Sequence, residues 1–455
     1  MVKIGLEVHV QLNTKSKIFC PCMNPVHLEK ELKPNTLCCP QCLGLPGAKP
    51  VFNKNVLEKA LKVALALKCR INEELFFSRK IYFYPDLPNN YQITQYEEPL
   101  GVKGVFQGIN ITRIHMEEDP GKLIHEGNTV LIDYNRSGTP LVEVVTEPEF
   151  ETAEQARLFL GKFLTLLEYL SVYDRKSEAS LRVDANISTT SERVEIKNIG
   201  SVKDVERALN FEIERQKSNQ VKVQETRGWN GDSGSSVLMR TKETEEDYGY
   251  IFEPNLTRIV ISQEGIEKVR ATLPELQDEK AKRFVKDYSM KFDDAKVITS
   301  DLALADLFEK VASKINHELT TIWFVKEIPR ILNYNNLSLS EWKITEKEII
   351  ELLKLLEENK ITKEIGRRII EKLVEKIFSP KEYVEENNLL AVSSEKELEK
   401  ICKKIIDENK DSTESYKKGE EKALHFLMGK VMRESKGKAD PYRTKEILKK
   451  LIENG

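Results

Sequence analysis

The stretch Ile4-Gly-Leu-Glu-Val-His-Val-Gln-Leu12 decides the fold of the N-terminal part, because its residues alternate between apolar and polar. The even-numbered positions are apolar, namely Leu6, Val8, Val10 and Leu12, and the odd-numbered positions Glu7, His9 and Gln11 are polar. Successive side chains of a strand point to opposite faces, so the stretch predicts a strand with one apolar and one polar face. Glu7 and His9 are groups that can hold a divalent cation or move a proton. The alternative is an ordinary exposed strand face.

Length and composition bound the class of protein. A chain of 455 residues exceeds one typical core, so two or three domains are expected. A hydrophobic fraction of 40% and a charged fraction of 32% indicate a folded, highly charged globular protein. The net charge of -3 argues against a globally basic nucleic-acid binder but allows a local basic surface. No apolar leader or stretch of roughly 18 apolar residues is present, so we expect a cytoplasmic protein without membrane contact.

The cysteines are clustered. Five of the seven lie between Cys20 and Cys42, in the pattern Cys-x-Cys followed by Cys-x-x-Cys. Four thiolates from two tight turns suit tetrahedral zinc, and we assign the ligands as Cys20, Cys22, Cys39 and Cys42. Because no His or Glu lies inside the cluster, we interpret the site as structural. The alternative is a set of reduced cysteines without metal. Cys38 is left over, and Cys69 and Cys402 are expected to pack in the core.

Further strands repeat the polar alternation. They are predicted over residues 111–119, 141–145, 181–188 and 193–197, and Glu143 stands inside an otherwise apolar one. An acid in such a strand is costly unless it is paired or bound to a cation. Several strands would therefore present Glu, Asp, His, Arg and Asn on one sheet face, a composition that suits magnesium and substrate phosphates. Structural cross-strand ion pairs are the competing interpretation.

Other segments predict a loop and helices. The run from Tyr82 to Gln95 predicts a structured loop that could stack on a planar ring and offer amides, unless its aromatic residues only pack. Helices are predicted from Thr152 to about Ser171 and over residues 202–218. From about Ser300 helical spacing continues to the end, with N-caps expected at Ser300, Thr345 and Thr362. A basic run near the C-terminus is either a solvated face or a phosphate-contacting surface, and it comprises Lys430, Arg433, Lys436 and Lys438.

Together these stretches resemble the B subunit of the aspartyl/glutamyl-tRNA(Asn/Gln) amidotransferases. The resemblance spans nearly the whole chain in family order and is carried by residues 4–12, 82–86, 91–95, 115–119, 135–143, 181–188 and 429–432. A related archaeal subunit carries a large extra domain before its tail, for which there is no room between Phe252 and Ser300. The B subunits are therefore the better match.

The resemblance implies an α+β fold. A mixed, largely antiparallel sheet forms a cradle like that of glutamine synthetase, followed by an all-α helical domain and a small helical tail domain. We place the cradle at residues 1–292, with a zinc loop at 20–42. The helical domain is placed at 293–388 and a tRNA-contacting tail at 389–455.

The resemblance also implies a reaction. ATP would phosphorylate the side-chain carboxylate of Glu or Asp misacylated on tRNA, and ammonia would then displace phosphate to give the amide. The chain has no serine–lysine amidase signature, so ammonia must come from a partner amidase (A) subunit, with a small C subunit completing the complex.

Residue roles follow from the same resemblance. Magnesium would be held by Glu7, His9, Glu118 and Glu143, with Glu117 as an alternate and Asp184 as a nearby acid. The pocket for ATP or the acylated tRNA end would involve Tyr82, Tyr84, Tyr91, Gln95 and Arg182.

Three other hypotheses stay open at this point. A zinc-stabilised RNA-binding protein would tolerate loss of Glu143, and a scaffold would show no magnesium-dependent ATP turnover. A phosphotransferase acting on a free amino acid would be indifferent to tRNA.

Overall fold

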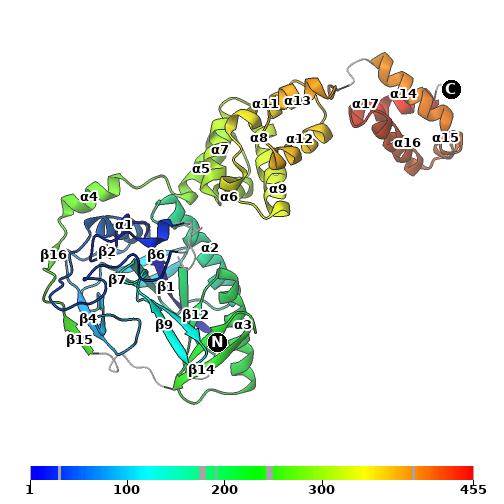
Figure 1. Cartoon of the computed structure of the whole chain (residues 1–455). Helices are drawn as coiled ribbons and strands as arrows, with labels where there is room; N and C mark the ends of the chain where they lie inside the picture. Colours follow the sequence, from blue (N-terminus) through cyan, green and yellow to red (C-terminus); the bar gives the residue numbers. More distant parts are fainter. Residues whose placement is uncertain are drawn as a thin grey trace. The chain divides into compact units, whose positions relative to one another are not determined.

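The computed structural model describes residues 2–28, 32–173, 181–189, 192–241, 249–391 and 395–453. It divides into two compact units, Met1–Leu276 and Gln277–Gly455. The first unit combines sheets and helices, and the second is helical throughout its described part (Figure 1). The predicted α+β class is therefore confirmed. Within the described residues, no helix combines the length and apolar character that crossing a bilayer requires.

A nine-stranded sheet forms the centre of the first unit among the described residues. Every neighbouring pair in it is antiparallel except β12 and β13. In spatial order its strands are β14 (Ser235–Thr241), β13 (Glu225–Asn230), β12 (Val194–Ile199), β11 (Leu181–Ser188), β1 (Lys3–Gln11), β10 (Pro140–Thr146), β7 (Ile109–Glu118), β6 (Gly101–Phe106) and β2 (Arg70–Ile71).

Three small sheets surround it. They are formed by β15 (Gly249–Phe252), β4 (Ser78–Ile81) and β5 (Tyr91–Thr94), by β16 (Ile259–Val260) and β3 (Glu74–Leu75), and by β8 (Lys122–Glu126) and β9 (Thr129–Asp133). The prediction of a loop from Tyr82 to Gln95 was therefore incomplete, because its last part pairs with β4 as a strand.

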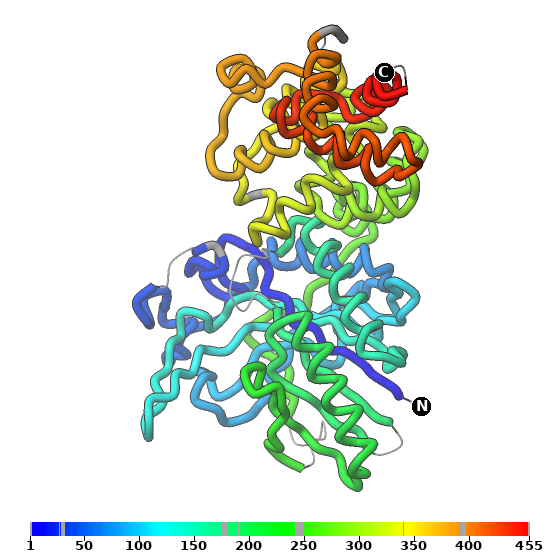
Figure 2. Tube along the Cα trace, turned by 90° about the vertical axis from the view of Figure 1, so that its right-hand side faces the viewer, coloured from blue at the N-terminus to red at the C-terminus, as the bar shows by residue number. Residues whose placement is uncertain are grey.

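The two faces of the central sheet differ as the alternation of β1 predicts. Leu6, Val8 and Val10 are at most 1% exposed and belong to one core with the apolar residues of the covering helices. These helices are α1 (Lys54–Ala66), α2 (Ala153–Tyr169) and α3 (Val202–Ser218). Helices α2 and α3 pack side by side (Figure 2). The opposite face carries the polar residues of β1, so the candidate site lies on a surface whose reverse side is fixed by a large core.

Short helices complete the first unit, and the second unit is built from helices alone in its described part. The remaining elements of the first unit are η1 (Pro25–His27) and α4 (Gln263–Ala271). The second unit comprises α5 (Gln277–Tyr288), α6 (Phe292–Thr299), α7 (Leu302–Ala312), α8 (His317–Ile322), the π-turn η3 (Trp323–Glu327), α9 (Ile328–Asn335), α10 (Leu339–Trp342), α11 (Glu346–Glu357), α12 (Lys363–Glu375), α13 (Pro380–Glu386), α14 (Glu395–Glu408), α15 (Lys410–Lys417), α16 (Glu421–Glu434) and α17 (Pro441–Glu453).

The second unit contains two hydrophobic clusters. One is formed by helices α5 to α13 and the other by α14, α16 and α17. Each amphipathic helix buries one apolar stripe, which is the pattern expected of helices that pack on one another.

Candidate active site and cysteine cluster

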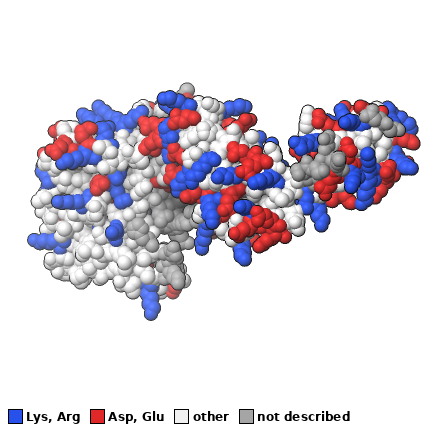
Figure 3. All heavy atoms as spheres, turned by 90° about the horizontal axis from the view of Figure 1, so that it is seen from above, with Lys and Arg blue, Asp and Glu red and all other residues white. Residues whose placement is uncertain are grey.

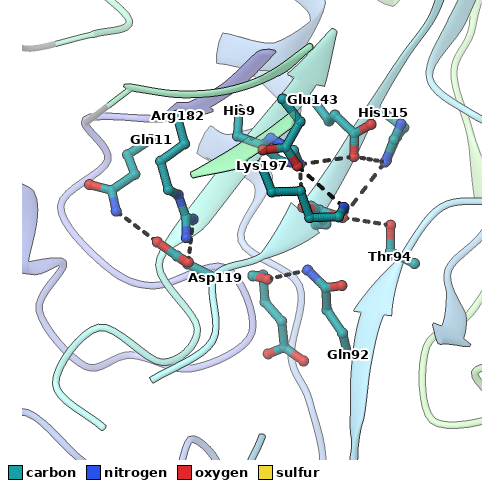
Figure 4. Close-up of polar contacts among 12 residues, drawn as sticks. His9, Gln11, Gln92, Thr94, His115, Asp119, Glu143, Arg182 and Lys197 are labelled. Atoms are coloured by element: carbon teal, nitrogen blue, oxygen red, sulfur yellow. Dashed lines mark hydrogen bonds and ion pairs between the residues drawn. The ribbon is translucent and has the colours of Figure 1, made fainter. Parts of the chain in front are cut away.

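The polar face of the central sheet brings four side chains together, of which three are buried and one, His9, is half-buried. His9 on β1 lies opposite Glu143 on β10, and Glu143 lies opposite His115 on β7. His9 Nε2 is 3.3 Å from Glu143 Oε2 and 3.6 Å from Glu117 Oε1. His115 Nε2 is 3.1 Å from Glu143 Oε2 and 3.7 Å from Glu117 Oε2. Each acid thus contacts both imidazoles. Figure 4 shows His9, Glu143 and His115 of this cluster side by side on the sheet.

The acids and histidines of this cluster shift the pKa values of one another. Burial alone would lower the pKa of each histidine, but the carboxylate of Glu143 above all raises the pKa of both His9 and His115 to about 9. Burial would raise the pKa of Glu143, yet the charges of the two histidines hold it well below its usual range. The two carboxylates and the two imidazoles therefore favour the charged forms of one another.

The donor set of His9, Glu117 and Glu143 fits a divalent cation. One ligand atom from each lies within 4.8 Å of the others, and all three are largely buried. Magnesium prefers carboxylate oxygens and commonly keeps water on its remaining positions. Two carboxylates and one imidazole at this spacing could hold such an ion once the histidine has lost its proton.

Neighbouring residues fix the orientation of these acids. Thr94 Oγ1 on β5 donates to Glu117 Oε2 at 3.1 Å. Gln95 Oε1 accepts from the Met116 amide at 2.9 Å, which ties β5 to β7. The carboxylate of Glu118 points to β5 instead, where Oε1 accepts from the Ile93 amide at 2.9 Å. Burial raises the pKa of Glu118 to about 8.

A second group of acids lies beside the first, on β1 and on the next two strands of the sheet, β11 and β12. Glu7, Asp184 and Glu195 also place one oxygen each within 4.8 Å of the others. Lys197 Nζ on β12 lies 2.7 Å from Glu195 and 3.5 Å from Asp184. Burial, followed by the charge of Glu143, raises the pKa of Glu7. Glu7 and Asp184 are thus adjacent to the first cluster but are grouped with a lysine rather than with His9.

Asp119 organises the edge of this face, a role that we did not predict. It is 0% exposed and accepts from Gln11 Nε2 at 2.7 Å and from Arg182 Nη2 at 2.5 Å. Arg136 Nε lies 3.6 Å away. Arg182, which we expected near a nucleotide, is therefore held by an internal carboxylate (Figure 4). The sequence feature that could have indicated this role is the acidic run Glu117-Glu-Asp119 at the end of a predicted strand.

The aromatic residues of the predicted pocket are spread along the β4–β5 connection. Tyr82 is half-buried and lies 5.8 Å from Lys80 Nζ, while Tyr84 is 54% exposed. The Arg79 guanidinium stacks 4.4 Å from the centre of the Tyr91 ring. Gln95 is buried, and its Nε2 has no hydrogen-bond partner in the described structure.

The four predicted zinc ligands come together. One Sγ atom from each of Cys20, Cys22, Cys39 and Cys42 lies within 4.8 Å of the others. Cys42 Sγ is 3.9 Å from both Cys22 Sγ and Cys39 Sγ. A tetrahedral site with Zn–S bonds of about 2.3 Å requires sulfurs about 3.8 Å apart, so this donor set fits zinc. Cys38 points elsewhere, with its thiol 3.9 Å from Asn135 Oδ1.

The basic residues near the C-terminus lie on α16 and just after it. Arg433 and Lys436 are exposed, while Lys430 and Lys438 are half-buried. Lys430 Nζ lies over the ring of Phe426, 5.4 Å from its centre. Figure 3 shows blue and red side chains interspersed over the visible face of the C-terminal helices, at the right of the view. Charge on that face is mixed rather than uniformly basic.

Known proteins match the chain along nearly all its length. The family model described as the GatB/GatE catalytic domain matches residues 2–267, and the one described as the GatB domain matches residues 306–452.

Curated relatives of the chain are, by name, B subunits of aspartyl/glutamyl-tRNA(Asn/Gln) amidotransferases. The one from Caldanaerobacter subterraneus subsp. tengcongensis is 46% identical over 468 residues, covering 98% of each chain. The one from Thermotoga petrophila is 43% identical over 479 residues, covering 99% of this chain and 98% of the relative. A third, from Carboxydothermus hydrogenoformans, is 42% identical over 473 residues, covering 98% of this chain and 97% of the relative.

Proposed function

Because the chain belongs to the GatB/GatE family of amidotransferase subunits, we propose that its sheet face carries the ATP-dependent step of tRNA-dependent amidation. In that step the side-chain carboxylate of Glu or Asp misacylated on tRNA attacks the γ-phosphorus of ATP and becomes an acyl phosphate, with ADP leaving. Ammonia then displaces phosphate to give the amide. The observation that carries this proposal is the buried cluster of His9, Glu117 and Glu143 inside the region matched by the catalytic-domain model.

We assign the metal-holding role to His9, Glu117 and Glu143, with Glu7 and Glu118 as neighbouring acids. Bound there, magnesium would neutralise phosphate oxygens during phosphoryl transfer. His115 and Thr94 orient the two carboxylates through their contacts at 3.1 Å. Tyr82, Tyr84, Tyr91, Gln95 and Arg182 remain our candidates for contacts to ATP or to the acylated tRNA end.

The other partners follow from the reaction. An acyl phosphate hydrolyses readily, so ammonia should arrive along a sheltered route from a partner amidase subunit. A small C subunit would complete the complex. The cysteine cluster would hold structural zinc, and the four basic residues near the C-terminus would contact the tRNA body in a cytoplasmic protein.

A phosphorylation assay tests the proposal. The purified complex, Glu-tRNA and γ-labelled ATP are mixed without an ammonia donor, and tRNA-linked γ-phosphoryl glutamate is measured. We expect Glu143→Gln to reduce its formation at least about 100-fold, because a cation ligand is lost. The control is Glu126→Gln, on the exposed strand β8.

Each alternative has its own outcome in this assay. Normal phosphorylation by Glu143→Gln would show that the acidic cluster is structural and would refute the site assignment. Absence of phosphorylation in the unmodified protein would favour an RNA-binding protein without catalysis. Phosphorylation of free glutamate without tRNA would indicate a phosphotransferase.

A further inference from the structure

Lys17 is a fully buried lysine beside the cysteine cluster. It is 0% exposed and is among the largest fully buried side chains of the described chain. Its ammonium group donates to the Leu37 carbonyl at 2.9 Å and lies 3.4 Å from the Tyr134 carbonyl. Within the described residues, no carboxylate lies at salt-bridge distance from it. A buried charge without a counter-charge is costly, so a negative partner of another kind is required.

The sulfur atoms are the negative groups at hand. The Leu37 carbonyl oxygen that accepts from Lys17 lies 4.0 Å from Cys42 Sγ. The Lys17 amide donates to the Cys22 carbonyl at 2.9 Å, so the same residue also fixes the first cysteine turn. Lys17 therefore contacts both cysteine turns, the first through its backbone amide and the second through the Leu37 carbonyl that lies beside Cys42 Sγ.

Charge balance connects these observations. Four thiolates around one divalent zinc ion carry a net charge of -2, and such a group is itself costly to bury. We propose that Lys17 is the buried counter-charge of a tetrathiolate metal centre formed by Cys20, Cys22, Cys39 and Cys42. This inference rests on the proposed metal at the four cysteines and adds a residue that holds it there.

Lys17 also joins the cysteine loop to the segment that leads into β10. The adjacent Ile18 amide donates to the Gly138 carbonyl at 2.9 Å, and Ser137 Oγ donates to the Cys42 carbonyl at 3.3 Å. A Cβ on Gly138 would lie 3.5 Å from Lys17 Cδ, and Gly138 has a φ of +79°. The competing explanation for the burial of Lys17 is purely structural: its ammonium group would only satisfy the Leu37 and Tyr134 carbonyls.

Two substitutions separate charge from hydrogen bonding. Lys17→Gln removes the charge and keeps a donor for a carbonyl, whereas Lys17→Met removes both. The matched control is Lys59→Met, because Lys59 Nζ also donates to a carbonyl, that of Ser171, and to Asn13 Oδ1. Like Lys17, Lys59 has no carboxylate at salt-bridge distance in the part of the chain that the structure describes. Lys59 lies on α1, and neither of its two partners belongs to the cysteine turns.

The experiment measures metal directly in the purified full-length protein. Zinc content is determined, and the rate of zinc transfer to a chromophoric chelator is followed; cobalt substitution reports sulfur coordination by its charge-transfer absorption. We expect both Lys17 variants to lose zinc about 10- to 100-fold faster than the unmodified protein, the usual cost of removing an outer partner of a metal site. Lys59→Met should lose zinc at the unmodified rate.

The outcomes separate the counter-charge role of Lys17 from the metal centre on which it rests. If the unmodified protein holds no zinc and gives no sulfur–cobalt absorption, the metal centre itself is refuted. If it holds zinc and Lys17→Gln releases zinc at the same rate, only the counter-charge role is refuted. Should neither Lys17 variant fold, Cys22→His is added to lower the negative charge of the site. Recovery of soluble protein then supports charge balance, and no recovery overturns it.

Discussion

His9 and Glu143 lie opposite each other on the adjacent strands β1 and β10, with Nε2 and Oε2 separated by 3.3 Å. The pairing places an imidazole and a carboxylate on one face at a spacing that a shared cation can bridge. It depends on strand register, since a slip by one residue would turn either side chain into the core.

The first prediction concerns metal binding by this pair. We expect Glu143→Gln to lower the affinity for Mn²⁺, used as a paramagnetic substitute for magnesium, about 10- to 100-fold, because a charged ligand becomes a neutral amide. Bound Mn²⁺ is counted by electron paramagnetic resonance, independently of activity. Glu126→Gln should bind Mn²⁺ as the unmodified protein does. Equal affinity in the two variants would remove Glu143 from the metal site.

The second prediction tests the orientation of Glu117 by Thr94. Thr94→Val deletes the hydrogen bond to Glu117 Oε2 and keeps the side-chain shape. We expect the magnesium concentration that supports half-maximal phosphorylation to rise about 10-fold. Thr146→Val is the control, because Thr146 Oγ1 accepts from the Leu6 amide at 2.9 Å, a contact to the backbone of β1 rather than to an acid of the cluster. That control should lower the melting temperature without changing the magnesium dependence. An unchanged magnesium dependence in Thr94→Val, or an equal change in Thr146→Val, would contradict the role of Thr94 in orienting Glu117.

The third prediction concerns pH. Glu253 is 0% exposed, and its carboxylate receives two hydrogen bonds from Arg79, at 2.7 and 3.0 Å. Burial alone would raise the pKa of Glu253, but Arg79 and the Asn255 amide lower it from the usual 4.5. A pKa lowered by folding stabilises the protein above about pH 4.5 and loses that contribution as pH falls through the folded-state value.

Glu253→Gln should therefore lower the free energy of unfolding at pH 7 by about 2 kcal/mol. The difference from the unmodified protein should shrink as the pH falls below 4.5. Urea unfolding across the pH range measures both effects. Glu74→Gln, which breaks an exposed pair with Arg258, should cost under about 1 kcal/mol. A pH-independent difference for Glu253→Gln would show that packing rather than ionisation sets its cost.

Local patterns predicted the elements well where burial dictates them. The alternation from Ile4 to Leu12 became β1, and the helix predicted over residues 202–218 became α3. Thr345 and Thr362 are confirmed as N-caps, but the prediction for Ser300 was wrong. Ser300 ends α6, and Asp301 caps α7 by accepting from the Leu304 amide at 2.9 Å. Both residues are good caps, so the sequence alone does not choose between neighbours.

The arrangement of the site was less predictable, because it depends on which strands become neighbours. Strand parity places Glu117 on the face of His115, and the orientation of Glu118 follows from β5, whose pairing with β4 the sequence pattern did not indicate. The buried roles of Asp119 and Lys17 arise from partners more than 60 and 100 residues away in the chain, Arg182 and Tyr134. Pairings of that range leave no periodic signal in either segment.

The last prediction concerns two basic residues at the C-terminal end of α16, Arg433 in its last turn and Lys436 just after it. Arg433 and Lys436 are exposed, so their guanidinium and ammonium groups are free to meet phosphates. If they contact the tRNA backbone, replacing both by Gln should weaken tRNA binding and reduce the slope of log affinity against log salt by about 1 per lost contact. Binding is measured by fluorescence anisotropy at several salt concentrations.

The control removes two other exposed lysines of the C-terminal helices, Lys417 on α15 and Lys450 on α17. Lys417 and Lys450 line a hollow of about 660 Å³ bounded by residues of α14, α15 and α17, on a different surface from α16. Replacing both by Gln changes the net charge by the same amount as the Arg433 and Lys436 pair. An equal loss of slope in both double variants would mean that the total charge of these helices matters and that no particular basic surface does. A loss confined to Arg433 and Lys436 would locate the tRNA contact, because only a phosphate held at that position releases its counterion there.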